Sequence, residues 1–216
     1  MIIEDLFREY QVKLLNGDRA GCMVIVKKLL AAKIEIKDLY VNLFQRSLYE
    51  IGSLWETNKI SVAIEHLSTA ITESLINLVY PHMFASEHCG KKAVITCTPG
   101  EFHQIGARMV ADYFEINGWD GYFLGANTPD DDIINFIKEH KPDLLAISMS
   151  VFFSMNSLQL LIAKVRQHFP DLTILLGGQG FIWGGEKAFH AMENVHLILS
   201  LDELDKKILK PMEYVS

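Results

Sequence analysis

A glutamate and a histidine lie two positions apart in a short polar segment, Glu101-Phe102-His103-Gln104-Ile105-Gly106. A histidine can offer one ring nitrogen to a metal while its other ring nitrogen donates to a carboxylate. That second hydrogen bond fixes the tautomer and raises the basicity of the ligand. Glu101 is the nearest candidate for the carboxylate. The alternative is a solvated histidine beside a solvated acid, so the pattern indicates a ligand site only if other parts of the chain agree.

The residues on either side of this segment predict that it lies at the edge of a sheet. An apolar run, Ala93–Cys97, ends at Thr98-Pro99-Gly100, and amphipathic residues follow from Ala107 to Glu115. This order is typical of a buried strand, a loop and a helix. Ligands of open α/β sheets bind outside the carboxyl ends of the strands, which is where His103 is expected.

The first eighty-odd residues predict a helical domain. Their apolar spacing is helical almost throughout, and Asp18 and Ser61 stand where helix N-caps are expected. The helices are expected at residues 6–15, 19–32, 36–55 and 61–84. Helices joined by such short turns predict an antiparallel four-helix bundle.

From Lys91 onward the pattern changes to alternating strands and helices. Apolar strand segments are expected at 93–97, 121–125, 143–148, 173–176 and 196–199, with helices after 107, 129, 156, 186 and 202. The predicted fold class is therefore α/β, a four-helix bundle followed by a flavodoxin-like or Rossmann-like, doubly wound, parallel five-stranded sheet. The predicted domains are residues 1–88 and 89–216.

Two further loops of the predicted sheet carry unusual residues at the carboxyl ends of their strands. The loop after the third strand contains Ser148, Ser150 and Ser154, and the loop after the fourth contains Gly177, Gly178 and Gly180. In a flavodoxin-like strand order, strands one, three and four are neighbours, so these loops line one crevice with His103. Local turns are the alternative explanation for the glycines, and local backbone bonds for the serines.

Composition narrows the class of protein. The chain has 216 residues, of which 50% are hydrophobic, and a formal net charge of −7. This charge argues against a nucleic-acid surface. Neither a membrane span nor a signal peptide is apparent, so we expect a cytoplasmic protein without membrane contact. The three cysteines, Cys22, Cys89 and Cys97, have no metal-site spacing, and we expect reduced thiols.

The loop residues resemble a known fingerprint. Asp-x-His-x-x-Gly, Ser-x-Leu and Gly-Gly mark the cobalamin-binding domain of the methionine-synthase type, and the chain carries similar residues at Glu101, His103, Gly106, Ser148, Ser150, Gly177 and Gly178. Two positions depart from the pattern, since glutamate replaces the usual aspartate and Ser150 stands where leucine is expected.

The resemblance implies roles for these residues. His103 becomes the lower axial ligand of cobalt in a base-off, His-on cobalamin, and Glu101 is its hydrogen-bonded partner. The nucleotide tail of the cofactor inserts beside the sheet, where Ser148, Gly177 and Gly178 contact it.

The helical half is similar to a second family. Nine residues separate Trp55 from Glu65-His66, which is the Trp-x9-Glu-His pattern of the adenosylcobalamin-dependent photoreceptor module in light-responsive MerR-type repressors. That family implies a helical cap in which the tryptophan covers the adenosyl group and the histidine takes the vacated cobalt position after photolysis. A tryptophan in the bundle core and a solvated Glu-His pair are the alternatives from composition alone.

The resemblance covers roughly residues 10–200 and does not include a DNA-binding domain. We therefore expect a stand-alone adenosylcobalamin-binding light sensor that acts as a signalling module and not as an enzyme, with a homo-oligomer or a separate effector as its partner. Direct nucleic-acid binding is not expected. The alternatives are a corrinoid methyl carrier for methyltransferases, which would hold methylcobalamin, and a light-independent cobalamin or redox sensor. Trp-x9-Glu-His argues against the carrier, while the fingerprint fits all three.

Overall fold

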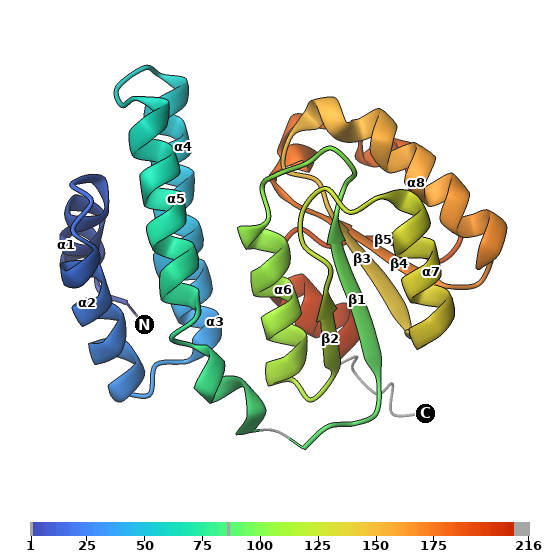
Figure 1. Ribbon diagram of the computed structural model, residues 1–216, viewed down its shortest axis with the longest axis horizontal. Helices are drawn as coiled ribbons and strands as arrows, with labels where there is room; N and C mark the ends of the chain where they lie inside the picture. Colours follow the sequence, from blue (N-terminus) through green and yellow to red (C-terminus); the bar gives the residue numbers. More distant parts are fainter. Residues whose placement is uncertain (1, 86, 210–216) are drawn as a thin grey trace. The chain divides into compact units, whose positions relative to one another are not determined.

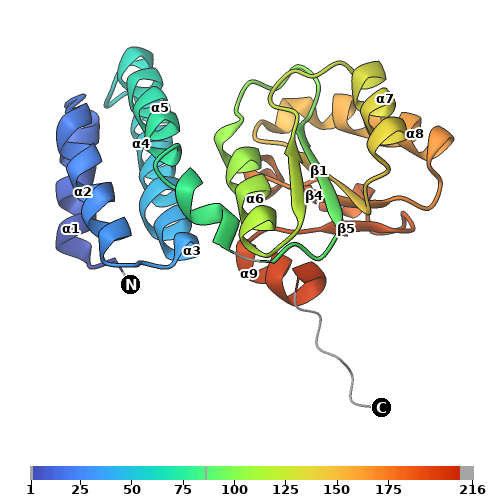
Figure 2. The ribbon, with the colours of Figure 1, turned by 60° about the horizontal axis from the view of Figure 1, so that its bottom comes forward.

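The chain folds into two compact units, which are drawn in Figures 1 and 2. The computed structural model describes residues 2–85 and 87–209. Unit 1 is Met1–Met83 and unit 2 is Phe84–Ser216, so the division falls slightly before the predicted boundary at residue 88. Met1, Ser86 and residues 210–216, which the predicted domains include, lie outside the described residues.

Unit 1 is helical. Its α-helices are α1 (Glu4–Leu15), α2 (Arg19–Ala31), α3 (Ile36–Leu39), α4 (Arg46–Glu56) and α5 (Val62–Ile76). A π-helical turn, Tyr40–Gln45, joins α3 to α4, so the long helix predicted at 36–55 is present as one helical run with a wider turn inside it. The last predicted helix ends earlier than expected, at Ile76, and a 3₁₀ segment, Tyr80–Ala85, follows.

Local capping chemistry starts two of these helices as predicted. The carboxylate of Asp18 accepts a hydrogen bond from the Gly21 amide at 2.8 Å, and the hydroxyl of Ser61 accepts from the Ile64 amide at 3.4 Å. Each bond satisfies an amide that has no partner inside the helix. Gly17, with a φ of +69°, turns the chain between α1 and α2.

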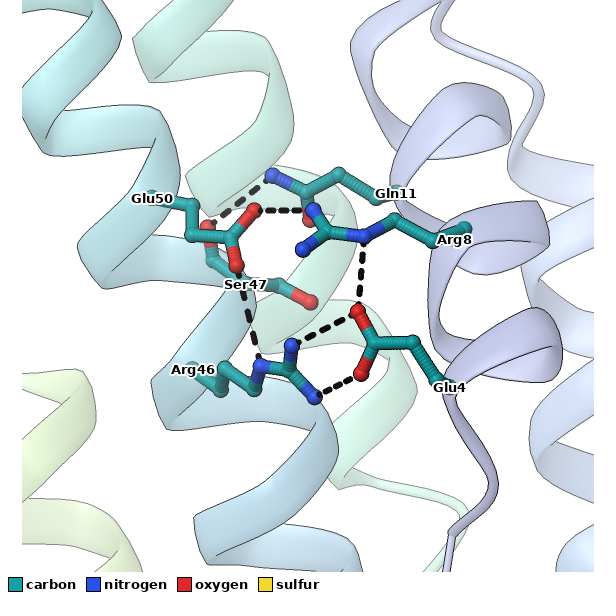
Figure 3. A network of polar contacts seen from close by, with 6 residues as sticks. All are labelled: Glu4, Arg8, Gln11, Arg46, Ser47 and Glu50. Atoms are coloured by element: carbon teal, nitrogen blue, oxygen red, sulfur yellow. Dashed lines mark hydrogen bonds and ion pairs between the residues drawn. The ribbon is translucent and has the colours of Figure 1, made fainter.

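A ring of charges fastens α1 to α4 (Figure 3). Acidic and basic side chains alternate around the ring in the order Glu4, Arg8, Glu50 and Arg46, with nitrogen-to-oxygen distances of 2.7 to 3.6 Å. Glu4 and Arg8 belong to α1, and Arg46 and Glu50 belong to α4. The guanidinium of Arg46 also stacks 3.7 Å from the centre of the buried Phe7 ring. Because the ring is a network and not an isolated pair, it orients the helix that ends near Trp55.

Unit 2 contains a five-stranded parallel sheet in the order β2-β1-β3-β4-β5. The strands are β1 (Lys92–Cys97), β2 (Asp120–Phe123), β3 (Leu144–Ser148), β4 (Thr173–Gly177) and β5 (Val195–Leu197). This is the predicted flavodoxin-like order, and the predicted fold class is confirmed. Strands β1, β3 and β4 are consecutive neighbours at the centre of the sheet.

Alternating side chains divide the sheet into two apolar faces (Figures 1 and 2). Val94, Leu145 and Ile174 pack with α7 (Asp130–His140) and α8 (Met155–His168) on one face. On the other face, Ile95 and Ala146 pack with α6 (Ile105–Ile116) and α9 (Leu201–Leu204). A short π-helical segment, Asp205–Leu209, follows α9. Burial on both faces explains why these strands are nearly continuous apolar runs.

The prediction of a helix at residues 186–192 is wrong. Only a 3₁₀ turn forms there, Glu186–Ala188. Phe189 is buried and meets Phe181 edge-on, with ring centres 6.0 Å apart, so the chain must bend to bring this side chain into the core. Asn194, at a φ of +55°, then turns the chain into β5.

Arg166 ties three segments of unit 2 together. Its guanidinium, near the end of α8, donates to the carbonyl oxygens of Phe169 and Leu172 before β4. It also donates to those of Glu193 and Asn194, both at 3.1 Å, before β5. Partial burial lowers the pKa of Arg166 from its ordinary value, but a guanidinium is not deprotonated in proteins and remains charged.

We expect Arg166→Met to lower the free energy of unfolding of unit 2 by about 2 kcal/mol, because charge-assisted hydrogen bonds are lost while the apolar stem is kept. Chemical denaturation followed by circular dichroism measures this change. The matched control is Lys138→Met on exposed α7 surface, which should change stability by less than about 0.5 kcal/mol. Equal stabilities of the two variants would contradict the prediction.

Candidate cofactor site at the carboxyl edge of the sheet

Three strand ends meet at one level of the sheet. Cys97 of β1 is paired in register with Ser148 of β3, and Ser148 is paired with Gly177 of β4. By the alternation of the strands, all three lie on the face covered by α6 and α9. The loops that follow these residues contain the predicted site residues of unit 2.

Glu101 is the centre of this cluster. Its side chain is buried although it carries a carboxylate, with only 3% of the residue exposed. One oxygen, Oε1, lies 2.6 Å from Nδ1 of His103. The other, Oε2, accepts hydrogen bonds from the backbone amides of Ser150 at 3.1 Å and Val151 at 3.0 Å, and from the hydroxyl of Ser154 at 3.4 Å. A buried carboxylate is stable only when its oxygens are paired in this way.

These bonds keep Glu101 ionised. Burial by itself would raise its pKa, but the hydrogen bond to His103 and those from the Val151 and Ser150 amides outweigh burial, so the pKa lies below its ordinary value. An ionised carboxylate can only accept hydrogen bonds, so Nδ1 of His103 carries the proton. In the neutral ring, Nε2 then holds the lone pair, which is the nitrogen a metal would use.

His103 itself is presented outward, with 64% of its side chain exposed. Its carbonyl oxygen lies 3.6 Å from the Cys97 thiol at the end of β1, and α6 begins two residues later, at Ile105. The loop therefore runs between a fixed strand end and a fixed helix start. This arrangement exposes the imidazole while it keeps the carboxylate beneath it buried.

Two residues that the sequence analysis did not single out support this loop. The Asn127 amide donates to the Glu101 carbonyl at 3.0 Å, and its side chain accepts from the Gly100 amide at 3.2 Å. Thr98 donates to the Ser148 carbonyl through both its amide and its hydroxyl. The sequence could have indicated Asn127, because it follows the second predicted strand two residues after Gly125, where a turn is expected. Asparagine tolerates the left-handed conformation that it adopts here, at a φ of +52°.

The predicted serines and glycines lie at the same edge but differ in what they contribute. Ser150 offers Glu101 its backbone amide, which any residue except proline could do. The β-carbon of a side chain at Gly177 would lie 2.7 Å from the Ile198 carbonyl, and one at Gly178 would overlap the Met149 carbonyl. Close backbone packing thus accounts for both glycines. At Gly106, by contrast, a β-carbon would meet no atom within 4 Å.

The other predicted site residues belong to unit 1. Trp55 lies in the last turn of α4 and is 46% exposed, so it is not a core residue of the helical unit. Glu65 and His66 lie in the first turns of α5, which packs against α4. Nε2 of His66 is 3.6 Å from Glu65, whose other oxygen accepts from the Thr69 hydroxyl at 3.0 Å.

Neither a metal-binding cluster of side chains nor a membrane-spanning helix is present among residues 2–85 and 87–209. No three His, Cys, Asp or Glu side chains gather there in a way that could hold a metal ion. Within the same residues, none of the helices combines the length and apolar character needed to cross a membrane.

Comparisons with known proteins agree with this geometry. A family model described as a B12 binding domain matches residues 91–191, and a second model with the same description matches residues 6–80. The HTH-type transcriptional repressor CarA of Myxococcus xanthus is 28% identical over 122 residues, 56% of this chain and 42% of the repressor. CarH of the same organism is 26% identical over 133 residues, 61% of this chain and 44% of that repressor. The chain thus spans less than half the length of either repressor.

A solved structure resembles the whole chain. The monomethylamine corrinoid protein of Methanosarcina barkeri matches with a TM-score of 0.81 and 18% identity, covering 97% of this chain and 99% of that protein. At this identity the likeness is one of fold.

We expect Glu101→Gln to lower the stability of the protein at pH 7 by about 1.5 kcal/mol, because an amide is a weaker acceptor and cannot carry the charge. A carboxyl with a lowered pKa stabilises the fold above its unfolded pKa, and this contribution is lost as the pH falls through the folded pKa. The gap between wild type and variant should therefore begin to narrow as the pH falls below about 4. Urea denaturation between pH 3 and pH 8 measures the gap, with exposed Glu139→Gln as the control. A gap independent of pH would contradict this account of Glu101.

Proposed function

Because this chain belongs to the family of proteins built from B12-binding domains, we propose that it holds adenosylcobalamin and acts as a light-responsive signalling module. When bound, this cofactor supplies a cobalt centre with an axial carbon bond that light can break. The residues of the chain have two tasks in the proposal: to hold the lower face of the cobalt and to cover its upper ligand.

The chemistry of the donor set in unit 2 fits such a cofactor. His103 presents an exposed imidazole whose Nδ1 is hydrogen-bonded to a buried carboxylate, the arrangement in which a histidine that binds a metal through Nε2 is usually found. In the proposal His103 is the lower axial ligand and Glu101 orients it. Ser148, Gly177 and Gly178 are assigned to the nucleotide tail, since Ser148 and Gly177 are paired at adjacent strand ends and Gly178 follows directly after β4.

The exposure of Trp55 is the observation that favours a light sensor. A tryptophan on an amphipathic helix is ordinarily a core residue, and burying one contributes about 2 to 3 kcal/mol. Trp55 is instead half-exposed at the end of α4, and His66, in the second turn of α5, is also exposed. Packing inside unit 1 does not account for this placement, whereas a role against the upper ligand does. We assign Trp55 to that ligand, and His66, beside Glu65, to the position it vacates in the light.

The proposed output is a change of assembly. Loss of the upper ligand would remove the contact surface of Trp55 and so change the relative stability of two states of the protein. A second copy of the chain or a separate effector protein would recognise the change. Nothing in this role requires the chain to catalyse a reaction.

A second candidate function is a corrinoid carrier that serves methyltransferases, with methylcobalamin as its cofactor. It is favoured by the fold match to the monomethylamine corrinoid protein, which extends over nearly all of both chains. The histidine and its carboxylate serve this role equally well, as they would a light-independent cobalamin or redox sensor. Only the light sensor gives the exposed Trp55 and His66 a function.

The experiment that separates these functions loads the protein with adenosylcobalamin in the dark and records its absorption spectrum and gel-filtration profile before and after green light. We expect a stable new spectrum together with a changed elution volume. His66→Ala should alter the illuminated spectrum and leave the dark one unchanged. Binding without a lasting change of spectrum or size would contradict the light sensor and favour the carrier.

Trp55→Ala should reduce the preference for adenosylcobalamin over methylcobalamin by about tenfold, because the apolar cover of the larger upper ligand is lost. The ratio of the two dissociation constants, measured by titration in the dark, reports this preference. Tyr49→Ala, an exposed aromatic residue on the same helix, is the matched control and should leave the ratio unchanged. Equal selectivity in wild type and Trp55→Ala would remove Trp55 from the site.

A further inference from the structure

We propose that the exposed face of α2 in unit 1 is a docking surface for an acidic amphipathic helix of a partner protein. The surface consists of the exposed side chains of α2 together with a groove between α2 and α5. It uses none of the residues assigned to the cofactor, so the inference rests neither on cobalamin nor on light.

The cations of this surface have no partner within the chain. Residues 19–34 contain four basic residues and no acidic one, although the formal net charge of the chain is −7. All four are exposed, and they are Arg19, Lys27, Lys28 and Lys33. None of these side chains forms a hydrogen bond or ion pair with a residue in the described part of the chain. The carboxylate at the N-cap, Asp18, is bonded to the Gly21 amide and to Lys13. A solvated helix face ordinarily carries both signs of charge, so this one favours an anionic partner.

Apolar side chains lie among the cations. Met23 is 37% exposed and Val24 is 47% exposed, and Ala20 and Ala31 also face solvent. At about 100° per residue, these positions and the basic residues of α2 fall on one side of the helix, opposite the buried Ile25. The exposed side of α2 therefore combines apolar contact area with positive charge, which is the complement of an acidic amphipathic segment.

A groove beside this face offers a place for apolar anchors. It lies between α2 and α5, which pack against each other, and it has a volume of about 310 Å³. Its lining is almost entirely apolar and includes Arg19, Ala20, Met23, Ile71, Leu75 and Leu78. A helix that docks on a protein surface places its i, i+3 and i+4 apolar side chains in a groove of this kind. Because Arg19 also lines the groove, a carboxylate next to such an anchor would meet a cation directly.

Length and charge select the occupant. From Arg19 to Lys28 the cations extend over nine residues of α2, about 14 Å along the helix axis. One phosphate or carboxylate group cannot reach across this length, whereas two to three turns of an acidic helix can. Nucleic acids and anionic membranes are extended polyanions, and a chain with a net charge of −7 is repelled by both at long range. A short acidic segment avoids most of this repulsion and also fills the apolar groove.

Binding of a designed peptide to the full-length protein tests the surface. The probe is a fluorescein-labelled helix of about 18 residues with leucines along one face and glutamates beside them, and a scrambled peptide of the same composition is its control. We expect fluorescence anisotropy to give a dissociation constant of about 20 μM at 50 mM salt, and about fivefold weaker binding at 300 mM salt because ion pairs are screened. The scrambled peptide should bind at least about tenfold more weakly, since its leucines do not share a face.

Substitutions on exposed positions assign the binding to α2. The double variant Lys27→Glu, Lys28→Glu should weaken binding of the acidic peptide at least about tenfold. Its matched control, Lys138→Glu with Lys187→Glu, makes the same change of net charge on exposed surface of unit 2 and should change binding less than about twofold. Met23→Ser should weaken binding about fivefold and leave its salt dependence unchanged, because an apolar contact and not a charge is lost.

Four results overturn the proposal. The first two are equal affinity of the double variant and its control, and equal binding of the designed and scrambled peptides. Tighter binding to vesicles with about 30% phosphatidylserine than to the peptide makes this face a membrane surface instead. Self-association that is abolished by Lys27→Glu, Lys28→Glu in sedimentation velocity makes it an interface between copies of the chain. All of these results leave cobalamin binding by unit 2 as it stands.

Discussion

One buried carboxylate holds the functional edge of unit 2 together. Glu101 is bonded to the axial imidazole candidate, to two amides and a hydroxyl of the loop after β3, and through its backbone to the loops after β1 and β2. Removing such a charge from water is unfavourable unless nearly every lone pair finds a donor. The three loops must therefore keep their positions for the carboxylate to remain buried, and the carboxylate in turn keeps them there. The ordering of the loops and the presentation of His103 are thus one property of the molecule.

The parallel sheet makes this arrangement possible. Its central strands are covered on both faces by apolar residues, so their positions are determined by packing and do not depend on the polar edge. All carboxyl ends point the same way, which brings residues from distant parts of the sequence, such as Cys97, Ser148 and Gly177, to one level. Glu101 and the amides of Ser150 and Val151 are about fifty residues apart in the sequence, yet they are joined directly by hydrogen bonds.

The separation between apolar packing in the sheet and polar contacts at its edge explains which features could be predicted from the sequence. Continuous apolar runs and the alternation of strands and helices predict the parallel sheet, because burial on two faces leaves a strong pattern, whereas the strand order came from the expected flavodoxin-like fold class. The pairing of Glu101 with His103 is local and was predictable from a spacing of two residues. The amides of Ser150 and Val151 were not, since a backbone donor leaves no signature in the side chain. The segment 186–192 was misjudged for a related reason: the burial of Phe189 is a long-range demand that overrides a local helical pattern.

The glycines show that a sequence motif can also have a purely structural cause. Gly177 and Gly178 match a fingerprint, yet in this structure their missing side chains make room for the carbonyl groups of Ile198 and Met149. A motif of this kind can arise from backbone packing and still serve a ligand, since the close approach of β4 and its neighbouring loops creates the strand-end geometry in which a tail would bind. Trp55 is the converse case, because packing within unit 1 does not explain its exposure. A residue whose placement is unexplained by the fold is therefore the better guide to function, and on that ground Trp55 and the outward-facing His103 carry more of the functional argument than the glycines do.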